Sequence, residues 1–155
     1  MGNQSYVLFY TIGHSTRRIE EFIKILRKYG IKLVVDVRRF PVSRKFPQFN
    51  REELSKSLKE NGIDYFWLGD LLGGYRSGGY RRYVKTDDFK RGIKRLIEVA
   101  IDGKTAIMCA EWSAMRCHRW YISDALTRLG HKVVHIINVK RCQTHKELSR
   151  IRRKK

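Results

Sequence analysis

Acidic residues are scarce in this 155-residue chain: fifteen Asp and Glu stand against thirty-four Lys and Arg, a formal net charge of +19. A small domain with so much charge of one sign repels itself unless a polyanion is near. Ion-pair networks of the kind found in heat-adapted proteins would need matching acids, which are missing. The balance therefore predicts nucleic acid, or another polyanion, as partner. An anionic membrane surface is the weaker alternative, because no predicted helix has a basic amphipathic stripe.

Long apolar runs and export signals are also absent. No stretch approaches the ~20 apolar residues that cross a bilayer, and residues 1–15 lack the basic segment and cleavage site of a signal peptide. The three cysteines are an odd number, which predicts free thiols in a reducing compartment. We therefore expect a cytoplasmic protein without membrane contact, and we infer no obligate protein partner.

Metal-ligand spacing is weak. A zinc site could be imagined from Cys109, Cys117, His118 and His14, but the chain has no CxxC pair. Cys117 and His118 are also neighbours at a predicted helix start, where adjacent side chains diverge by ~100°. We expect no metal and no cofactor.

What is present alternates between short apolar runs and helical spacing. Strands are predicted over residues 6–12, 32–37, 63–68, 105–108 and 132–137. Strand–helix–strand repetition with apolar strands is typical of a mainly parallel sheet. We predict an α/β protein with one three-layer domain, residues 1–139, of about five strands with helices on both faces. Residues 140–155 carry eight Lys or Arg and one Glu, which predicts a basic C-terminal arm or a short helix from His145.

Residues 69–88 contain five glycines and no periodicity, so we expect a long structureless loop of functional importance. Within it, residues 73–83 interleave arginines and tyrosines, among them Tyr75 and Arg76. This combination suits phosphate contact and base stacking. The alternative is an ordinary disordered surface loop.

Ligands of open α/β sheets bind beyond the carboxyl ends of the strands, so the residues at those ends are the candidate site. The loop at 38–50 holds both prolines of the chain and is expected to flank the site with basic charge, and we include its Ser43 and Arg44 as substrate-binding candidates. The polar and aromatic residues at the strand ends themselves are His14, Ser15, Asp36, Arg38, Cys109, Glu111, Trp112, Cys117, His118 and Arg119.

Several of these residues admit two roles. Asp36, at the end of a buried strand, is either ion-paired with Arg38 in an orienting role, the reading we favour, or a general base of raised pKa. Glu111 is the freer carboxylate. His14 is a hydrogen-bond donor or proton carrier beside a helix N-terminus, unless the turn only caps that helix through Ser15.

Cys109 and Trp112 also admit two roles each. Cys109 is either a small core residue or a thiolate whose pKa is lowered by the following helix N-terminus. Trp112, on a loop of a basic protein, is either a stacking surface for a base or packing over the sheet edge.

The motifs TIGHS (11–15), VDVR (35–38) with FPVSR (40–44), LGG (72–74), and MCAE…CHR (108–119) followed by LGHKVVHI resemble the prokaryotic domain-of-unknown-function family 488. The resemblance extends over nearly the whole chain. It implies that these polar residues form the family's shared cluster, and it implies no particular activity. A weaker similarity is to rhodanese-like domains, which also place Asp-Val-Arg at a strand end and a cysteine after a later strand. The loop after Cys109 departs from theirs.

The first functional hypothesis is a nucleic-acid-processing hydrolase, in its sharpest form a DNA glycosylase-like base-excision enzyme acting on a damaged or modified base. Glu111 or Asp36 would activate water, and Trp112 and the tyrosines would hold a flipped base. DNA is favoured over RNA. The alternatives are a cysteine-dependent, rhodanese-like transferase using Cys109, and a nucleic-acid-binding protein without catalysis.

Overall fold

The predicted alternation of strands and helices is present in the structure, a computed structural model that describes residues 6–153. The strands are β1 (Leu8–Gly13), β2 (Leu33–Asp36), β3 (Asp64–Trp67), β4 (Thr105–Cys109), β5 (Lys132–Ile136) and β6 (Cys142–Thr144). The α-helices are α1 (Ile19–Lys28), α2 (Arg51–Glu60), α3 (Gly69–Leu72), α4 (Tyr80–Tyr83), α5 (Asp87–Val99), α6 (Arg119–Arg128) and α7 (His145–Arg153). Two short 3₁₀ turns, η1 (Pro47–Phe49) and η2 (Ala114–Arg116), precede α2 and α6.

The six strands form one sheet in the order β3-β2-β4-β1-β5-β6, parallel except for β6, which runs antiparallel to β5. The predicted α/β class with a mainly parallel sheet is therefore confirmed. The sheet has one strand more than expected. Residues 142–144 were not predicted as a strand because three residues, Cys-Gln-Thr, are too few to show an alternating pattern.

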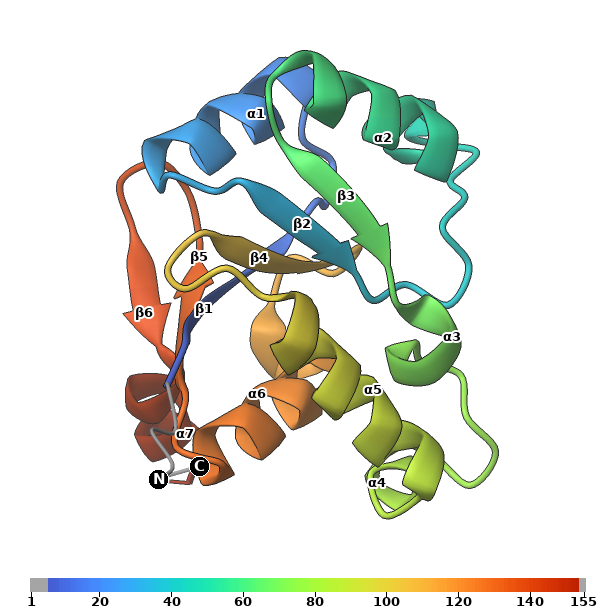
Figure 1. Ribbon diagram of the computed structural model, residues 1–155, viewed down its shortest axis with the longest axis vertical. Coiled ribbons are helices and arrows are strands. Elements are labelled where there is room, and N and C mark those ends of the chain that lie inside the picture. The colour runs from blue at the N-terminus through green and yellow to red at the C-terminus, as the bar shows by residue number, and fades with distance from the viewer. Residues whose placement is uncertain (1–5, 154–155) are drawn as a thin grey trace.

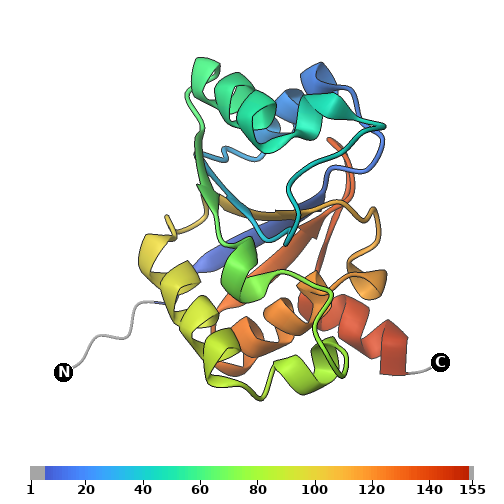
Figure 2. The ribbon, with the colours of Figure 1, turned by 90° about the vertical axis from the view of Figure 1, so that its right-hand side faces the viewer.

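Helices cover both faces of this sheet, with α1 and α2 on one side and α5 and α6 on the other (Figures 1 and 2). Neighbouring residues of β2 separate the two cores: Val34 packs with apolar residues of α1 and α2, whereas Val35 packs with those of α5 and α6. A strand buried on both faces is apolar on both, which explains the continuous apolar run Leu33–Val35; the buried Asp36 ends the strand.

The C-terminal segment is part of the folded domain. β6 extends the sheet edge and α7 packs beside β5, β6 and α6 (Figure 1). Arg152 of α7 also stacks over the Trp120 ring, 4.6 Å from its centroid. No helix within residues 6–153 is long and apolar enough to cross a membrane.

The glycine-rich segment is more ordered than predicted. It contains the single turns α3 and α4, and two tyrosine hydroxyls tie these turns together: Tyr80 donates to the Leu72 carbonyl at 2.7 Å, and Tyr83 donates to that of Leu71 at 2.6 Å. The expectation of a structureless loop was wrong because these hydrogen bonds, and the packing of Tyr83 into the core, have no signal in local periodicity.

Gly13, the last residue of β1, lets the loop after β4 approach the sheet. A Cβ atom at this position would lie 1.7 Å from the Glu111 carbonyl oxygen and 3.2 Å from Nη2 of Arg119. Only a residue without a side chain fits so close to backbone. The strand end and the loop that carries the cysteines are thus fixed against each other.

We expect Gly13→Ala to lower the free energy of unfolding by about 3 kcal/mol, because the added methyl group must displace backbone. Gly74→Ala is the matched control: its Cβ would lie 3.5 Å from the nearest atom, an ordinary contact, and we expect a change below about 1 kcal/mol. Urea unfolding of the two variants measures the difference. Equal stability would contradict this account of Gly13.

Candidate active site

The carboxyl ends of β1, β2 and β4 open into a cavity of about 780 Å³, which we call the strand-end cavity. Its walls come from the loops that follow those three strands and from the glycine-rich segment. Of the residues predicted at the site, those that line it are His14, Ser15, Arg38, Ser43, Tyr75, Cys109, Glu111, Trp112, Cys117 and His118.

The entrance of this cavity is unusually apolar and basic. Eight large apolar side chains are exposed among the described residues, and four of them line this cavity. These four are Phe40 (63% exposed), Val42 (69%), Tyr75 (84%) and Trp112 (52%). The charged side chains that line it are Arg38, Arg39, Lys45, Arg116 and one carboxylate, Glu111. Aromatic faces beside cations suit a ligand that is both flat and anionic.

Asp36 is completely buried and fully engaged. Its Oδ1 accepts hydrogen bonds from the Arg38 backbone and Nε at 3.0 and 2.9 Å, and its Oδ2 accepts from Arg38 Nη2 and the Tyr65 hydroxyl at 2.8 and 2.5 Å. Burial, and then the Asp36 charge, raise the pKa of Tyr65. Of the two roles left open for Asp36, the structure has the ion-paired, orienting one.

His14 is held as a neutral imidazole. Its Nδ1–H donates to the Ser15 carbonyl at 2.9 Å, and its Nε2 accepts from Arg38 Nη1 at 3.3 Å. The ring stacks on Phe49 with 4.3 Å between centroids. Burial lowers the pKa of His14 to about 4, so the ring does not take up a second proton near neutral pH. The predicted role as proton carrier does not fit this environment.

Ser15 does not cap the following helix. It has a left-handed φ of 50°, its backbone N–H donates to Ala110 at 3.0 Å, and α1 begins four residues later at Ile19.

Arg119, the first residue of α6, is 1% exposed and contacts three residues that line the strand-end cavity. Its Nε donates to Cys109 Sγ at 2.9 Å and its Nη1 to Thr11 Oγ1 at 2.8 Å. Its Nη2 donates to the carbonyls of Glu111 and Trp112 at 2.9 and 3.3 Å. No carboxylate of residues 6–153 forms a salt bridge with it. A buried cation of this kind favours negative charge on the sulfurs beside it.

The two buried thiols respond differently to this cation. Burial raises the pKa of Cys117, but its hydrogen bond with Cys109 and the charge and N–H groups of Arg119 outweigh that effect and lower the pKa to about 7. Burial, together with the hydrogen bond to Cys117, raises the pKa of Cys109. The lowered pKa falls on Cys117 and not on Cys109, the thiol expected from the sequence, because Cys117 accepts hydrogen bonds from Cys109 and from the Arg119 backbone N–H at 3.4 Å.

His118 completes this group. Its Nε2–H donates to the Val37 carbonyl at 2.7 Å, which leaves Nδ1 as an acceptor 3.6 Å from Cys117 Sγ. Burial lowers the pKa of His118, so the ring is a neutral acceptor. A thiol, a base within reach and a third group that orients the base are the parts of an activated nucleophile.

Besides the buried Asp36 and Arg119, two further predicted residues do not line the strand-end cavity. Arg44 is exposed and does not line it. Arg76 donates to the carbonyls of Gly73 and Asp70 at 2.9 and 2.5 Å and stacks over the Tyr83 ring, so it holds the glycine-rich segment together. Ser43 lines the wall and accepts from the Phe46 N–H at 2.9 Å.

Sequence reasoning missed several further residues of the site. Arg39, Phe40, Val42 and Lys45 belong to the 38–50 loop, whose basic charge was recognised without its apolar members. Thr11, inside β1, gave no signal because polar residues within a parallel strand usually have structural roles. Arg116 could have been found, since it belongs to the loop that carries Cys117.

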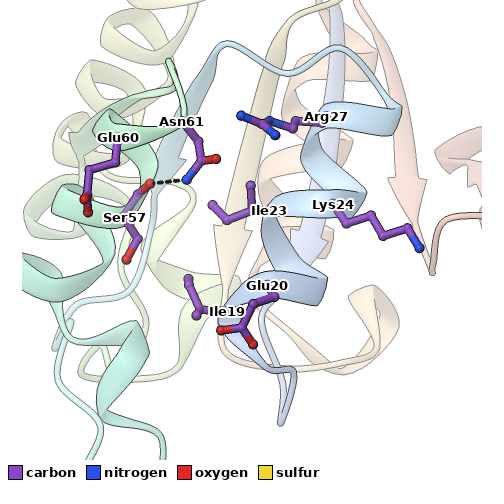
Figure 3. A pocket seen from close by; sticks show the side chains of 8 residues that line it. All are labelled: Ile19, Glu20, Ile23, Lys24, Arg27, Ser57, Glu60 and Asn61. Atoms are coloured by element: carbon purple, nitrogen blue, oxygen red, sulfur yellow. Dashed lines mark hydrogen bonds between the residues drawn. The ribbon is translucent and has the colours of Figure 1, made fainter.

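A second hollow, of about 440 Å³, lies between α1 and α2 (Figure 3). Its charged residues are of both signs, Glu20, Lys24, Arg27 and Glu60, and Asn61 there donates to the Ser57 carbonyl at 2.8 Å. The described residues that line it include neither a cysteine nor a histidine. No group of three or more His, Cys, Asp or Glu able to hold a metal ion occurs among residues 6–153.

A family model described as "Domain of unknown function DUF488" matches residues 18–126, which is 109 of the 155 residues. The chain belongs to this family. The matched range of the DUF488 model includes Asp36, Arg38 and the loop from Cys109 to Arg119, and it begins after the GHS turn, so it is shorter than the resemblance first suggested. No curated protein and no solved structure matches the chain.

We expect acid to destabilise this DUF488 protein through His14. Because its pKa is lower in the folded chain than its ordinary value of 6.5, the unfolded chain binds the proton more tightly. The stability is fully present above pH 6.5 and is lost as the pH falls toward 4, by about 3 kcal/mol from this residue. Urea unfolding at several pH values should show a flatter dependence for His14→Gln, and identical slopes would contradict the assignment.

We expect Arg119→Lys to slow alkylation of Cys117 by iodoacetamide at pH 7. A lysine keeps the positive charge but loses the planar guanidinium and its hydrogen bonds, so we expect the pKa of Cys117 to rise by about one unit in the variant. About half of the thiol is ionised at pH 7 when its pKa is near 7, and roughly a tenth when its pKa is near 8. The alkylation rate should therefore fall about fivefold. Peptide mapping by mass spectrometry gives the rate at each cysteine. Arg116→Lys, in the same loop but exposed, is the control and should change the rate little. An unchanged rate in Arg119→Lys would refute the role of Arg119.

Proposed function

We propose that this DUF488 protein is a thiol-dependent group-transfer enzyme that acts on nucleic acid, with Cys117 as nucleophile. The observation that carries the proposal is Arg119, a buried guanidinium that has two thiols beside it and forms no salt bridge with any carboxylate of the described residues. Such an arrangement stabilises a thiolate at neutral pH. A purely structural arginine would be expected to pair with an acid, as Arg38 does with Asp36.

The reaction follows from the contacts of Cys117. Its proton passes to His118 Nδ1, and the thiolate attacks an electrophilic carbon of the substrate. A sulfur–carbon bond forms while the bond to the leaving group breaks. The leaving group departs with that electron pair and takes the proton from His118. A second nucleophile, water or an acceptor hydroxyl, then forms a bond to the carbon, gives its proton to His118 and releases Cys117 as a thiolate.

The entrance of the strand-end cavity supports a nucleic acid as substrate. Trp112 and Tyr75 expose ring faces on which bases could stack, and Arg39, Lys45 and Arg116 could contact phosphates. The overall charge of +19 would draw a polyanion toward this entrance. DNA is proposed ahead of RNA. Free thiols at the centre of the site require a reducing compartment, which supports a cytoplasmic location.

Base excision is the second candidate, and Glu111 favours it. Glu111 is exposed and is the one carboxylate among the described residues that line the strand-end cavity, next to Trp112. A glycosylase could use it to activate water. Asp36 is unsuited to that role because Arg38 and Tyr65 occupy both of its oxygens.

Oligonucleotides separate the two candidates. Single-stranded and duplex DNA and RNA 20-mers with a panel of modified bases are incubated with the protein, then analysed for complexes that survive SDS and for strand scission after alkali. We expect a covalent complex with the wild type that is lost in Cys117→Ser and kept in Cys142→Ser, the control, because Cys142 lies on β6 outside the cavity. Alkali-labile sites that need Glu111 and not Cys117 would establish the glycosylase and overturn the thiol proposal. A panel without any Cys117-dependent product would also contradict it.

A further inference from the structure

A chain of hydrogen bonds connects Arg119 to four residues that do not line the strand-end cavity. Thr11 Oγ1, which accepts from Arg119 Nη1, lies 2.6 Å from His135 Nδ1. His135 Nε2 lies 2.9 Å from His145 Nδ1, and His145 Nε2 lies 2.6 Å from Asp124 Oδ1. Thr11, His135 and His145 are each no more than 2% exposed, whereas the Asp124 side chain is 33% exposed.

With both histidines neutral, one arrangement of the protons gives every donor in this chain of hydrogen bonds an acceptor. Because Thr11 accepts from Arg119, its own proton is available to His135 Nδ1. His135 then carries its proton on Nε2 and donates to His145, which in turn donates from Nε2 to Asp124. In the reverse direction the Thr11 proton would have no partner and His145 would need a second proton. Burial lowers the pKa of His135 well below its ordinary value, in agreement with a neutral ring.

This chain joins a cation to an anion across the core. Within residues 6–153 no carboxylate pairs directly with Arg119, but three polar side chains connect it to the carboxylate of Asp124. The links come from different elements: Thr11 from β1, His135 from β5, His145 from the start of α7 and Asp124 from α6. Hydrogen bonds in series polarise one another in a low dielectric, so the far end can bias the near end.

We propose that Asp124, His145, His135 and Thr11 are positioning residues that hold the Arg119 guanidinium against the two thiols, so that the C-terminal helix α7 is a working part of the active site. This inference rests on the proposed function of Cys117. Because the Arg119 guanidinium keeps its proton, the chain orients and polarises and does not conduct protons to sulfur.

The competing explanation is that these bonds only hold α7 on the sheet. That role would change stability and leave the thiol unaffected. The ionisation of Cys117 separates the explanations. The ionisable groups that influence Cys117 or contact it are Cys109, Arg119, His118 and Tyr80, none of which the experiment alters.

The experiment measures the iodoacetamide alkylation rate of Cys117 from pH 5 to 10 in the full chain. Thr11→Val keeps the shape of the side chain and removes the oxygen, and Thr11→Ser keeps the hydroxyl. We expect the rate at pH 7 to fall about fivefold in Thr11→Val and to stay within about twofold of wild type in Thr11→Ser. Asp124→Asn, at the partly exposed end of the chain, should lower it about twofold.

Arg152→Ala is the control for the packing of α7, since it removes the contact with the Trp120 ring and leaves the hydrogen bonds from Arg119 to Asp124 in place. It should lower the melting temperature without moving the alkylation profile. If wild-type Cys117 titrates near pH 7 but Thr11→Val and Asp124→Asn keep that profile, the positioning role is wrong and the proposed nucleophile stands. If Thr11→Val does not fold, Asp124→Asn decides. A wild-type Cys117 that ionises only near pH 9 overturns both proposals.

Discussion

The burial of the Arg119 guanidinium is the constraint on which the site depends. A cation removed from water must be surrounded by acceptors, and here these are two backbone carbonyls, a threonine hydroxyl and sulfur. The same contacts set the path of the loop after β4, and that path requires a glycine at position 13. One buried charge therefore determines both the shape of the loop and the ionisation of the thiols within it.

A second buried arginine of the site, Arg38, differs from Arg119 because it is paired with a carboxylate. Arg38 and Asp36 neutralise each other at the end of β2, and Arg38 also donates to His14. Burial lowers the pKa of His14, and the Arg38 charge adds to that effect, so the ring beside this pair stays neutral. Under the proposed function, this difference explains why a cysteine is the nucleophile and Asp36 is not: Asp36 is already paired with Arg38, whereas the acceptors around Arg119 are neutral oxygens and cysteine sulfur.

The sequence allowed the architecture and the location of the site to be predicted, because both depend on the alternation of strands and helices and on the rule that ligands bind at strand ends. It did not allow the roles to be assigned. Cys109 and Cys117 look alike in sequence, and which of them ionises depends on burial and on the path of the Arg119 side chain. The contacts of His135 and His145 join segments far from Thr11 along the chain, so no local pattern could indicate them.

The central claim is that Cys117 ionises near pH 7 while Cys109 remains a thiol. Carbon-13 labelling of the cysteine Cβ atoms, followed by NMR through a pH titration of the unmodified protein, observes both residues at once. The account predicts that the Cys117 resonance titrates with a midpoint near pH 7 and that the Cys109 resonance does not move below pH 9. A Cys117 resonance that stays in the thiol position up to pH 8.5 would contradict it.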